Sequence, residues 1–81
     1  MNVRVKFYAQ LRELIGIHEL ELELPEGATV RELLETLYAQ KPALRAHDNS
    51  ILLGAGLEFV DRNYKPNPGE EIAIMPPVQG G

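Results

Sequence analysis

Residues 29–38 read TVRELLETLY, and this stretch decides the fold of the chain. Thr29 and Glu32 have the spacing of a capping box, in which each side chain bonds the backbone N–H of the other residue, so a helix is predicted to begin here. Pro42 is expected to stop that helix, or to break it near Gln40. Apolar residues recur within it at i, i+3, i+4, i+7 and i+8, namely Val30, Leu33, Leu34, Leu37 and Tyr38. One stripe of the helix is therefore predicted to pack on a sheet.

Two strands are predicted on the N-terminal side of this helix, because apolar and polar residues alternate over residues 2–8 and 18–24. We expect the two strands to pair antiparallel. Arg4 and Lys6 would then share the outer face with a row of glutamates, Glu19, Glu21 and Glu23. Such a row is interpreted as a solvated face, in preference to a metal or substrate site.

The segment between these strands, AQLRELI at residues 9–15, switches to helical spacing. Its apolar side is predicted to hold Leu11, Leu14 and Ile15. Gly16 follows at the position of a helix C-cap glycine, so the short helix is expected to end there.

Further strands are predicted beyond a polar, loop-like stretch at residues 44–50 that could hold a short helical turn. Residues 51–55 and 58–60 read as two short strands joined at Gly56, and residues 71–75 read as the last strand, with Ile72 and Ile74 inward. The order of elements predicts an α+β fold, a sheet with one long helix on one face. We expect residues 1–75 to form the single domain and residues 76–81 a flexible tail.

The composition of the chain excludes several classes of function. The chain has 81 residues, 44% of them hydrophobic and 25% charged, as in an ordinary folded domain. A net charge of −4 argues against a nucleic-acid partner. The absence of cysteine excludes disulfides, thiol nucleophiles and cysteine-based zinc sites. No apolar run approaches the roughly 20 residues of a membrane helix, and no signal peptide is evident, so a cytoplasmic location is expected. His18 and His47 are interpreted as surface residues with no metal.

The last six residues, PPVQGG, form the most unusual segment. Pro76 and Pro77 cannot continue a sheet ladder, so they are expected to hold the chain extended. Gly80 and Gly81 have no side chains, so this end could thread a narrow channel and present its carboxylate. An ionised carboxylate is a poor electrophile and needs activation, most simply as an acyl adenylate made from ATP. The chain has no P-loop of its own, so a separate enzyme would supply that step. A frayed terminus with no function is the alternative.

Five segments carry a resemblance to a known family: VKFYAQLREL-IG, PEGATV with the following LL, FVDRNY, PGEEIAIMPPV and the final QGG. Together they resemble the small, sulfur-carrying subunit of molybdopterin synthase, which has the ubiquitin-like β-grasp fold, as does the sulfur carrier of thiamine synthesis. The resemblance covers essentially the whole chain. Its most specific part is the ending PPV-x-GG. The chain departs from the family at Gly56-Leu57, where an Asn is frequent, and at Gln79, where a small residue is common.

The resemblance implies a non-catalytic, sulfur-donating subunit with no resident cofactor or metal. A ubiquitin-activating-type enzyme would use ATP to adenylate Gly81, next to Gly80, and a sulfur donor protein would convert it to a thiocarboxylate. The tail would then enter the large synthase subunit and give its sulfur to cyclic pyranopterin monophosphate. Two small and two large subunits would form a heterotetramer.

The resemblance also implies partner-binding residues. Tyr8, Phe59 and Met75 match an apolar patch of the family, and Arg12 matches an arginine near it. The tail residues Pro76, Pro77 and Val78 would enter the partner. Strand alternation already turns Tyr8 and Met75 outward, whereas it leaves the face of Phe59 open.

Three alternatives remain at this stage. The chain could carry sulfur for tRNA thiolation or thiamine synthesis, it could be a ubiquitin-like protein modifier, or it could be an interaction domain with an inert tail. The chemistry of the first two classes is the same through adenylation, so only the PPV ending and the apolar patch favour molybdopterin.

Overall fold

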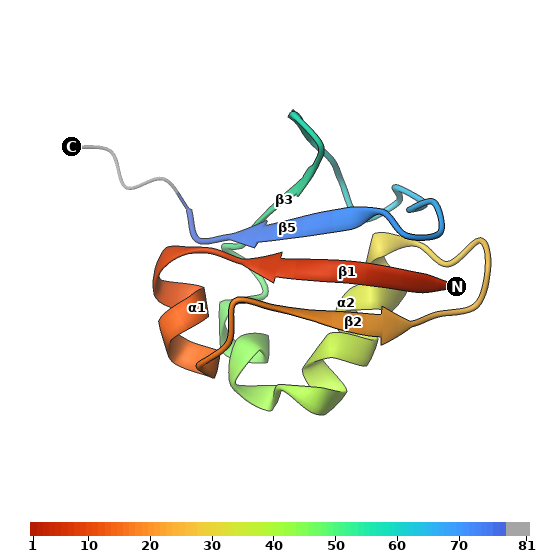
Figure 1. The fold of residues 1–81 in the computed structure, drawn as a ribbon. Coiled ribbons are helices and arrows are strands. Elements are labelled where there is room, and N and C mark those ends of the chain that lie inside the picture. The colour runs from red at the N-terminus through yellow and green to blue at the C-terminus, as the bar shows by residue number, and fades with distance from the viewer. Residues whose placement is uncertain (78–81) are drawn as a thin grey trace.

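The helix predicted from the capping box packs on a five-stranded mixed sheet in the computed structural model, which describes residues 1–77 (Figure 1). The sheet order is β2-β1-β5-β3-β4. β1 is antiparallel to β2 and parallel to β5, while β3 is antiparallel to both β5 and β4. The elements are β1 (Asn2–Phe7), α1 (Ala9–Ile15), β2 (Glu19–Glu23), α2 (Val30–Gln40), the 3-10 helix η1 (Pro42–His47), β3 (Leu52–Ala55), β4 (Glu58–Phe59) and β5 (Glu71–Met75). The predicted α+β sheet is confirmed.

The capping box sets the start of α2. The backbone N–H of Glu32 donates to Thr29 Oγ1 at 3.3 Å, and the backbone N–H of Thr29 donates to Glu32 Oε1 at 3.5 Å. α2 ends at Gln40, as Pro42 predicts. The chain then continues as η1, with Pro42 in its first turn, so much of the predicted loop at residues 44–50 is helical and buries Leu44.

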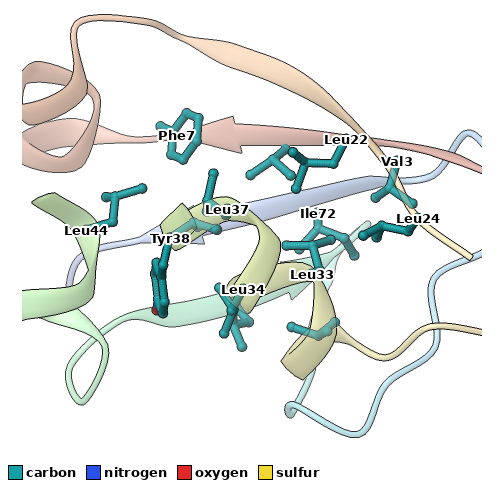
Figure 2. Packing of buried hydrophobic residues seen from close by; sticks show 14 of the residues in the cluster. Val3, Phe7, Leu22, Leu24, Leu33, Leu34, Leu37, Tyr38, Leu44 and Ile72 are labelled. Atoms are coloured by element: carbon teal, nitrogen blue, oxygen red, sulfur yellow. The ribbon is translucent and has the colours of Figure 1, made fainter. Parts of the chain in front are cut away.

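The core lies between α2 and the inner face of the sheet (Figure 2). All five residues of the predicted α2 stripe are at most 3% exposed. Across from them, β1 and β5 place Val5 opposite Ile72 and Phe7 opposite Ile74, and these four side chains are at most 1% exposed. Full burial of a side chain of this size contributes about 1.5–3 kcal/mol, so the α2–β1–β5 contact dominates the stability of the fold.

The side of α1 that was predicted to be apolar is only partly buried. Leu11 is 2% exposed and Ile15 is half-buried, but Leu14 is 45% exposed. α1 has only seven residues, and among them Leu11 alone is fully buried. Gly16 closes the helix with φ 76° and donates its N–H to the carbonyl of Arg12, as expected of a C-cap glycine.

The charged outer face follows the predicted pairing of β1 with β2. Arg4 stands opposite Glu21, and its guanidinium lies 3.4 Å from Glu19 Oε2 and 4.0 Å from Glu21 Oε1. The side chains are about half exposed, so each pair contributes little to stability. These pairs support the interpretation of the glutamate row as a solvated face.

A polar link that the sequence did not reveal joins α2 to two loops. The Tyr38 hydroxyl donates to Asp48 Oδ1 at 2.6 Å, and the Arg62 guanidinium donates to the same oxygen at 2.8 Å. The bond from Tyr38, followed by the bond from Arg62, lowers the pKa of the Asp48 carboxyl. Burial, together with the bond to Asp48, raises the pKa of the Tyr38 hydroxyl above its ordinary value.

Substituting Asp48→Asn is expected to lower the free energy of unfolding at neutral pH by roughly 1 kcal/mol. The substitution removes the negative charge of the group that accepts hydrogen bonds from Tyr38 and Arg62, and the effect stays small because these bonds are only partly buried. The folded-state pKa of Asp48 is lowered, so its stabilisation is present above the unfolded carboxyl pKa of about 3.9 and is lost as the pH falls through the folded value. The difference between wild type and variant in denaturant unfolding should therefore stay constant from pH 7 down to about pH 4 and shrink as the pH falls further.

The matched control is Glu35→Gln, which removes the ion pair between Glu35 and Arg45 on side chains that are 65% and 60% exposed. Its effect should be near zero at either pH. A pH-independent loss in the Asp48 variant would contradict the assignment.

Candidate functional site: the apolar patch at the base of the tail

The tail leaves from the middle of the sheet. β5 lies between β1 and β3, and its last residue, Met75, is followed by Pro76 and Pro77, the last two described residues (Figure 1). Neither proline has an N–H, so neither can donate to a ladder, and β5 ends where the sequence predicts. Pro76 is half-buried and Pro77 is exposed. The remaining predicted tail residues, Val78, Gly80 and Gly81, lie outside the described residues.

Beside this exit, the structure brings together Tyr8, Phe59 and Met75. They line one depression of about 310 Å³, with Leu57 and Ala73 at its sides. We call Tyr8, Leu57, Phe59 and Met75 the apolar patch. Phe59 stands opposite Gly54, which itself stands opposite Ala73, so Phe59 faces outward and is 73% exposed. The sequence had left this orientation open.

Two contacts hold Tyr8 on this face, one from its backbone and one from its ring. It has extended backbone angles, φ −126° and ψ 151°, and its N–H donates to the carbonyl of Ile74 at 3.2 Å, so it keeps the alternation of β1. The Lys6 ammonium lies 5.7 Å from the centre of its ring, within the range of a cation–π contact. The next residue, Ala9, takes a positive φ of 50°, which turns the chain from β1 into α1.

Gly54 forms the floor of the depression, and the sequence analysis missed it. A Cβ at this buried position would lie 3.2 Å from the terminal methyl carbon of Met75 and 3.7 Å from Ala73 Cβ. The lack of a side chain therefore lets the Met75 methyl lie over β3. A glycine inside a strand pattern marks such close approaches, and this signal was present in the sequence.

Leu57 was noted in the sequence only as a departure from the family. Gly56, with φ 62°, forms the turn between β3 and β4, and Leu57 follows it fully exposed. A large exposed apolar side chain next to Phe59 enlarges the patch beyond the three predicted residues. Arg12 is exposed on α1 and does not line the depression.

Two further features are absent from the described residues: a metal-binding cluster and a membrane-spanning helix. Within residues 1–77 no three or more His, Cys, Asp or Glu side chains gather as a metal site would need. None of the helices in the same range has the length and apolar character that a membrane crossing requires.

Substituting Gly54→Ala is expected to move the Met75 methyl group while changing the free energy of unfolding by about 1 kcal/mol or less, because the crowded atom is the free end of a flexible side chain. The chain has only two methionines, so the methyl resonance of Met75 can be followed by NMR with Met1 as the internal control. An unchanged Met75 resonance would show that Gly54 does not shape the patch.

Comparisons with known proteins agree with this architecture. The sequence profile of the ThiS family matches residues 5–81. The molybdopterin synthase sulfur carrier subunit of Chlamydomonas reinhardtii is 34% identical, over 100% of both chains. The crystal structure of SAMP1, small archaeal modifier protein 1, from Haloferax volcanii is 27% identical and superposes with a TM-score of 0.87 over 100% of both chains.

A further solved structure shows the same fold at lower identity. It is a complex of subunits 1 and 2 of the molybdopterin-converting factor of Helicobacter pylori, in which the matching chain is 21% identical, with a TM-score of 0.71 over 100% of both chains. The predicted ubiquitin-like β-grasp fold is thus confirmed. The match over residues 5–81, with a full-length relative at 34% identity, shows that this chain belongs to the ThiS family.

Proposed function

We propose that this chain is a sulfur carrier for molybdopterin synthesis, which bears sulfur as a thiocarboxylate on Gly81. The observation that carries the proposal is the position of the apolar patch directly beside the strand that leads into the PPVQGG ending. A partner that binds the apolar patch is close to the terminal carboxylate, because only six residues follow Met75. The membership of the ThiS family and the name of the Chlamydomonas relative support the same function.

The first chemical step is activation of Gly81. A terminal carboxylate oxygen would attack the α-phosphorus of ATP on a separate activating enzyme, forming an acyl adenylate and releasing pyrophosphate. The outer sulfur of a persulfide on a donor protein would then displace AMP at the carbonyl carbon and form an acyl disulfide. A second thiolate, from the donor or the activating enzyme, would attack the donor's own sulfur, which releases the thiocarboxylate and leaves a disulfide on the protein that supplied the sulfur. The chain contributes its terminal carboxylate to the first step, and it has no cysteine that could supply the sulfur or hold it elsewhere.

The second step is delivery. The thiocarboxylate would be held by the large synthase subunit and pass its sulfur to cyclic pyranopterin monophosphate. Pro76 and Pro77 separate the reactive end from the sheet, and Gly80 and Gly81 carry no side chain that would obstruct a narrow channel. The Helicobacter pylori complex of two subunits supports a large-subunit partner, and we propose a heterotetramer of two small and two large subunits.

A second candidate function is protein modification. The likeness to small archaeal modifier protein 1 at 27% identity favours it. Modification would share the adenylate but would end in an amide bond to a lysine of a target protein. Transfer of sulfur to tRNA or to a thiamine precursor would instead share the thiocarboxylate. Recovery of lysine-linked conjugates from cells, in place of the large subunit, would support modification.

Deleting Gly81 is expected to abolish thiocarboxylate formation and leave the melting temperature nearly unchanged, because a glycine has no side chain to pack and this one follows the last strand by six positions. The test is intact-mass measurement of wild type and variant after incubation with the activating enzyme, ATP and the sulfur donor. Wild type should gain a species with one oxygen replaced by sulfur. If wild type gains none, the sulfur-carrier proposal is wrong.

Substituting Phe59→Glu is expected to weaken binding of the large subunit by about 2 kcal/mol, or roughly thirtyfold, because it places a charge at the desolvated centre of the contact. Phe59 is 73% exposed, so the fold should persist. The matched control is Ala43→Glu, which adds the same charge at an exposed position on η1. Equal affinities of the two variants in titration calorimetry would rule out the patch as the binding surface.

A further inference from the structure

One side chain of the apolar patch gains nothing from the fold. Leu57 has a relative exposure of 105%, so it is at least as accessible as in an extended peptide. Phe59, its neighbour in the patch, is 73% exposed, and Tyr8 is 36% exposed. Because an apolar side chain contributes to folding only when it is removed from water, the stability of this chain does not account for a leucine at position 57.

The turn that carries Leu57 does not account for it either. Gly56 and Leu57 form the two-residue loop between Ala55 and Glu58, which pair across β3 and β4. Gly56 has φ 62° and Leu57 has no positive φ, which is the sign pattern of a type II′ turn. Such loops favour Asn, Asp or Ser after the glycine, because short polar side chains bond the local backbone. A leucine here breaks a local preference without a gain in packing, which is the pattern expected of a functional position.

The turn holds Leu57 at a defined place beside the depression of the patch. A two-residue loop closed by a strand pair has few backbone conformations, so little entropy is lost when its tip is bound. The turn between β3 and β4 stands out from the sheet on the side opposite to the helices, at the top of Figure 1. The depression of about 310 Å³ over Gly54 adjoins it. The patch thus combines a projecting side chain with a neighbouring hollow.

Charged side chains lie at the margin of this surface. Glu58 is the one charged residue among the described residues that line the depression. Strand alternation turns its side chain away from that of Phe59, and its carbonyl oxygen would lie 3.5 Å from a Cβ at Gly54, so its backbone forms part of the lining. Lys6 lies over the ring of Tyr8 and does not line the depression. The centre of the surface is therefore apolar.

The chemistry of the projection limits what can receive it. Covering a leucine is favourable in an apolar pocket, whereas polar groups that face it lose their bonds to water without replacement. Contacts between permanent subunits are more apolar than those between transient partners. A fully exposed leucine beside an exposed phenylalanine therefore fits a subunit partner that stays bound.

We propose that Leu57 is a specificity determinant for the large synthase subunit, which would receive it in an apolar pocket next to a protrusion that fills the depression. The proposal rests on the function proposed above, because that function names the partner. A protein with polar groups at this place, or with no pocket, would leave Leu57 poorly covered and would bind more weakly.

The test replaces Leu57 with residues of graded size and polarity and measures binding of the large subunit by titration calorimetry. Leu57→Met keeps the apolar volume and should change the affinity by less than about threefold. Leu57→Asn gives the turn a residue that it favours, but should weaken binding by about tenfold or more, because the pocket loses its apolar occupant.

A larger side chain distinguishes a pocket from a flat apolar surface. Leu57→Trp should weaken binding, because an indole does not fit a pocket shaped for leucine. The matched control is Ala43→Trp, which adds the same ring at an exposed position on η1 and should bind like wild type. A gain in affinity for Leu57→Trp would show a flat surface with no selection by shape, and an equal loss in both variants would contradict a local contact.

Two readouts separate a contact from a structural role. Leu57 is fully exposed, so the melting temperatures of its variants should stay close to that of wild type. At saturating activating enzyme, the rate of adenylation, measured by pyrophosphate release, should be unchanged because the chemistry at Gly81 is unaltered. A loss in either readout would show a disturbed fold or tail and would overturn the assignment.

The inference and the proposed function fail in different ways. Unchanged affinity in Leu57→Asn, together with a loss of affinity in Phe59→Glu, would overturn the role of Leu57 and leave the proposed function standing. Failure of wild type to bind the large subunit at all would overturn the proposed function, and with it the partner named here.

Discussion

The pairing of β5 with β1 on one side and β3 on the other is the interaction on which the rest of this structure depends. Ile72 and Ile74 lie on the inner side of β5 and complete the core under α2, while Ala73 and Met75 lie on its outer side. β5 thus contributes to the packing of the core, sets the point where the tail leaves the sheet and supplies Met75 to the apolar patch. The alternation of a strand separates these roles, because successive side chains point to opposite faces.

Local signals were sufficient to predict most of the fold. The capping box of Thr29 and Glu32, the helical spacing of the α2 stripe and the alternation in β1, β2 and β5 each depend on neighbours within a few residues. The structure differs from these predictions by about a residue at the strand ends. The outward orientation of Tyr8 and Met75 followed from the same alternation.

Features that depend on contacts between distant segments could not be predicted in this way. The exposure of Leu14 depends on the shortness of α1, whose seven residues bury only Leu11 fully. The link from Asp48 to Tyr38 and Arg62 joins three segments that only the folded chain brings together. The role of Gly54 depends on the position of the Met75 methyl group across the neighbouring strand.

The central position of the last strand has a consequence for the synthesis of the protein. Parallel pairing of β5 joins Glu71 to Arg4, near opposite ends of the chain. A nascent or truncated chain that lacks β5 leaves β1 and β3 without their common neighbour, so the sheet cannot close until β5 has been synthesised. Chains broken before β5 therefore expose unpaired strand edges, which makes them targets for aggregation and proteolysis.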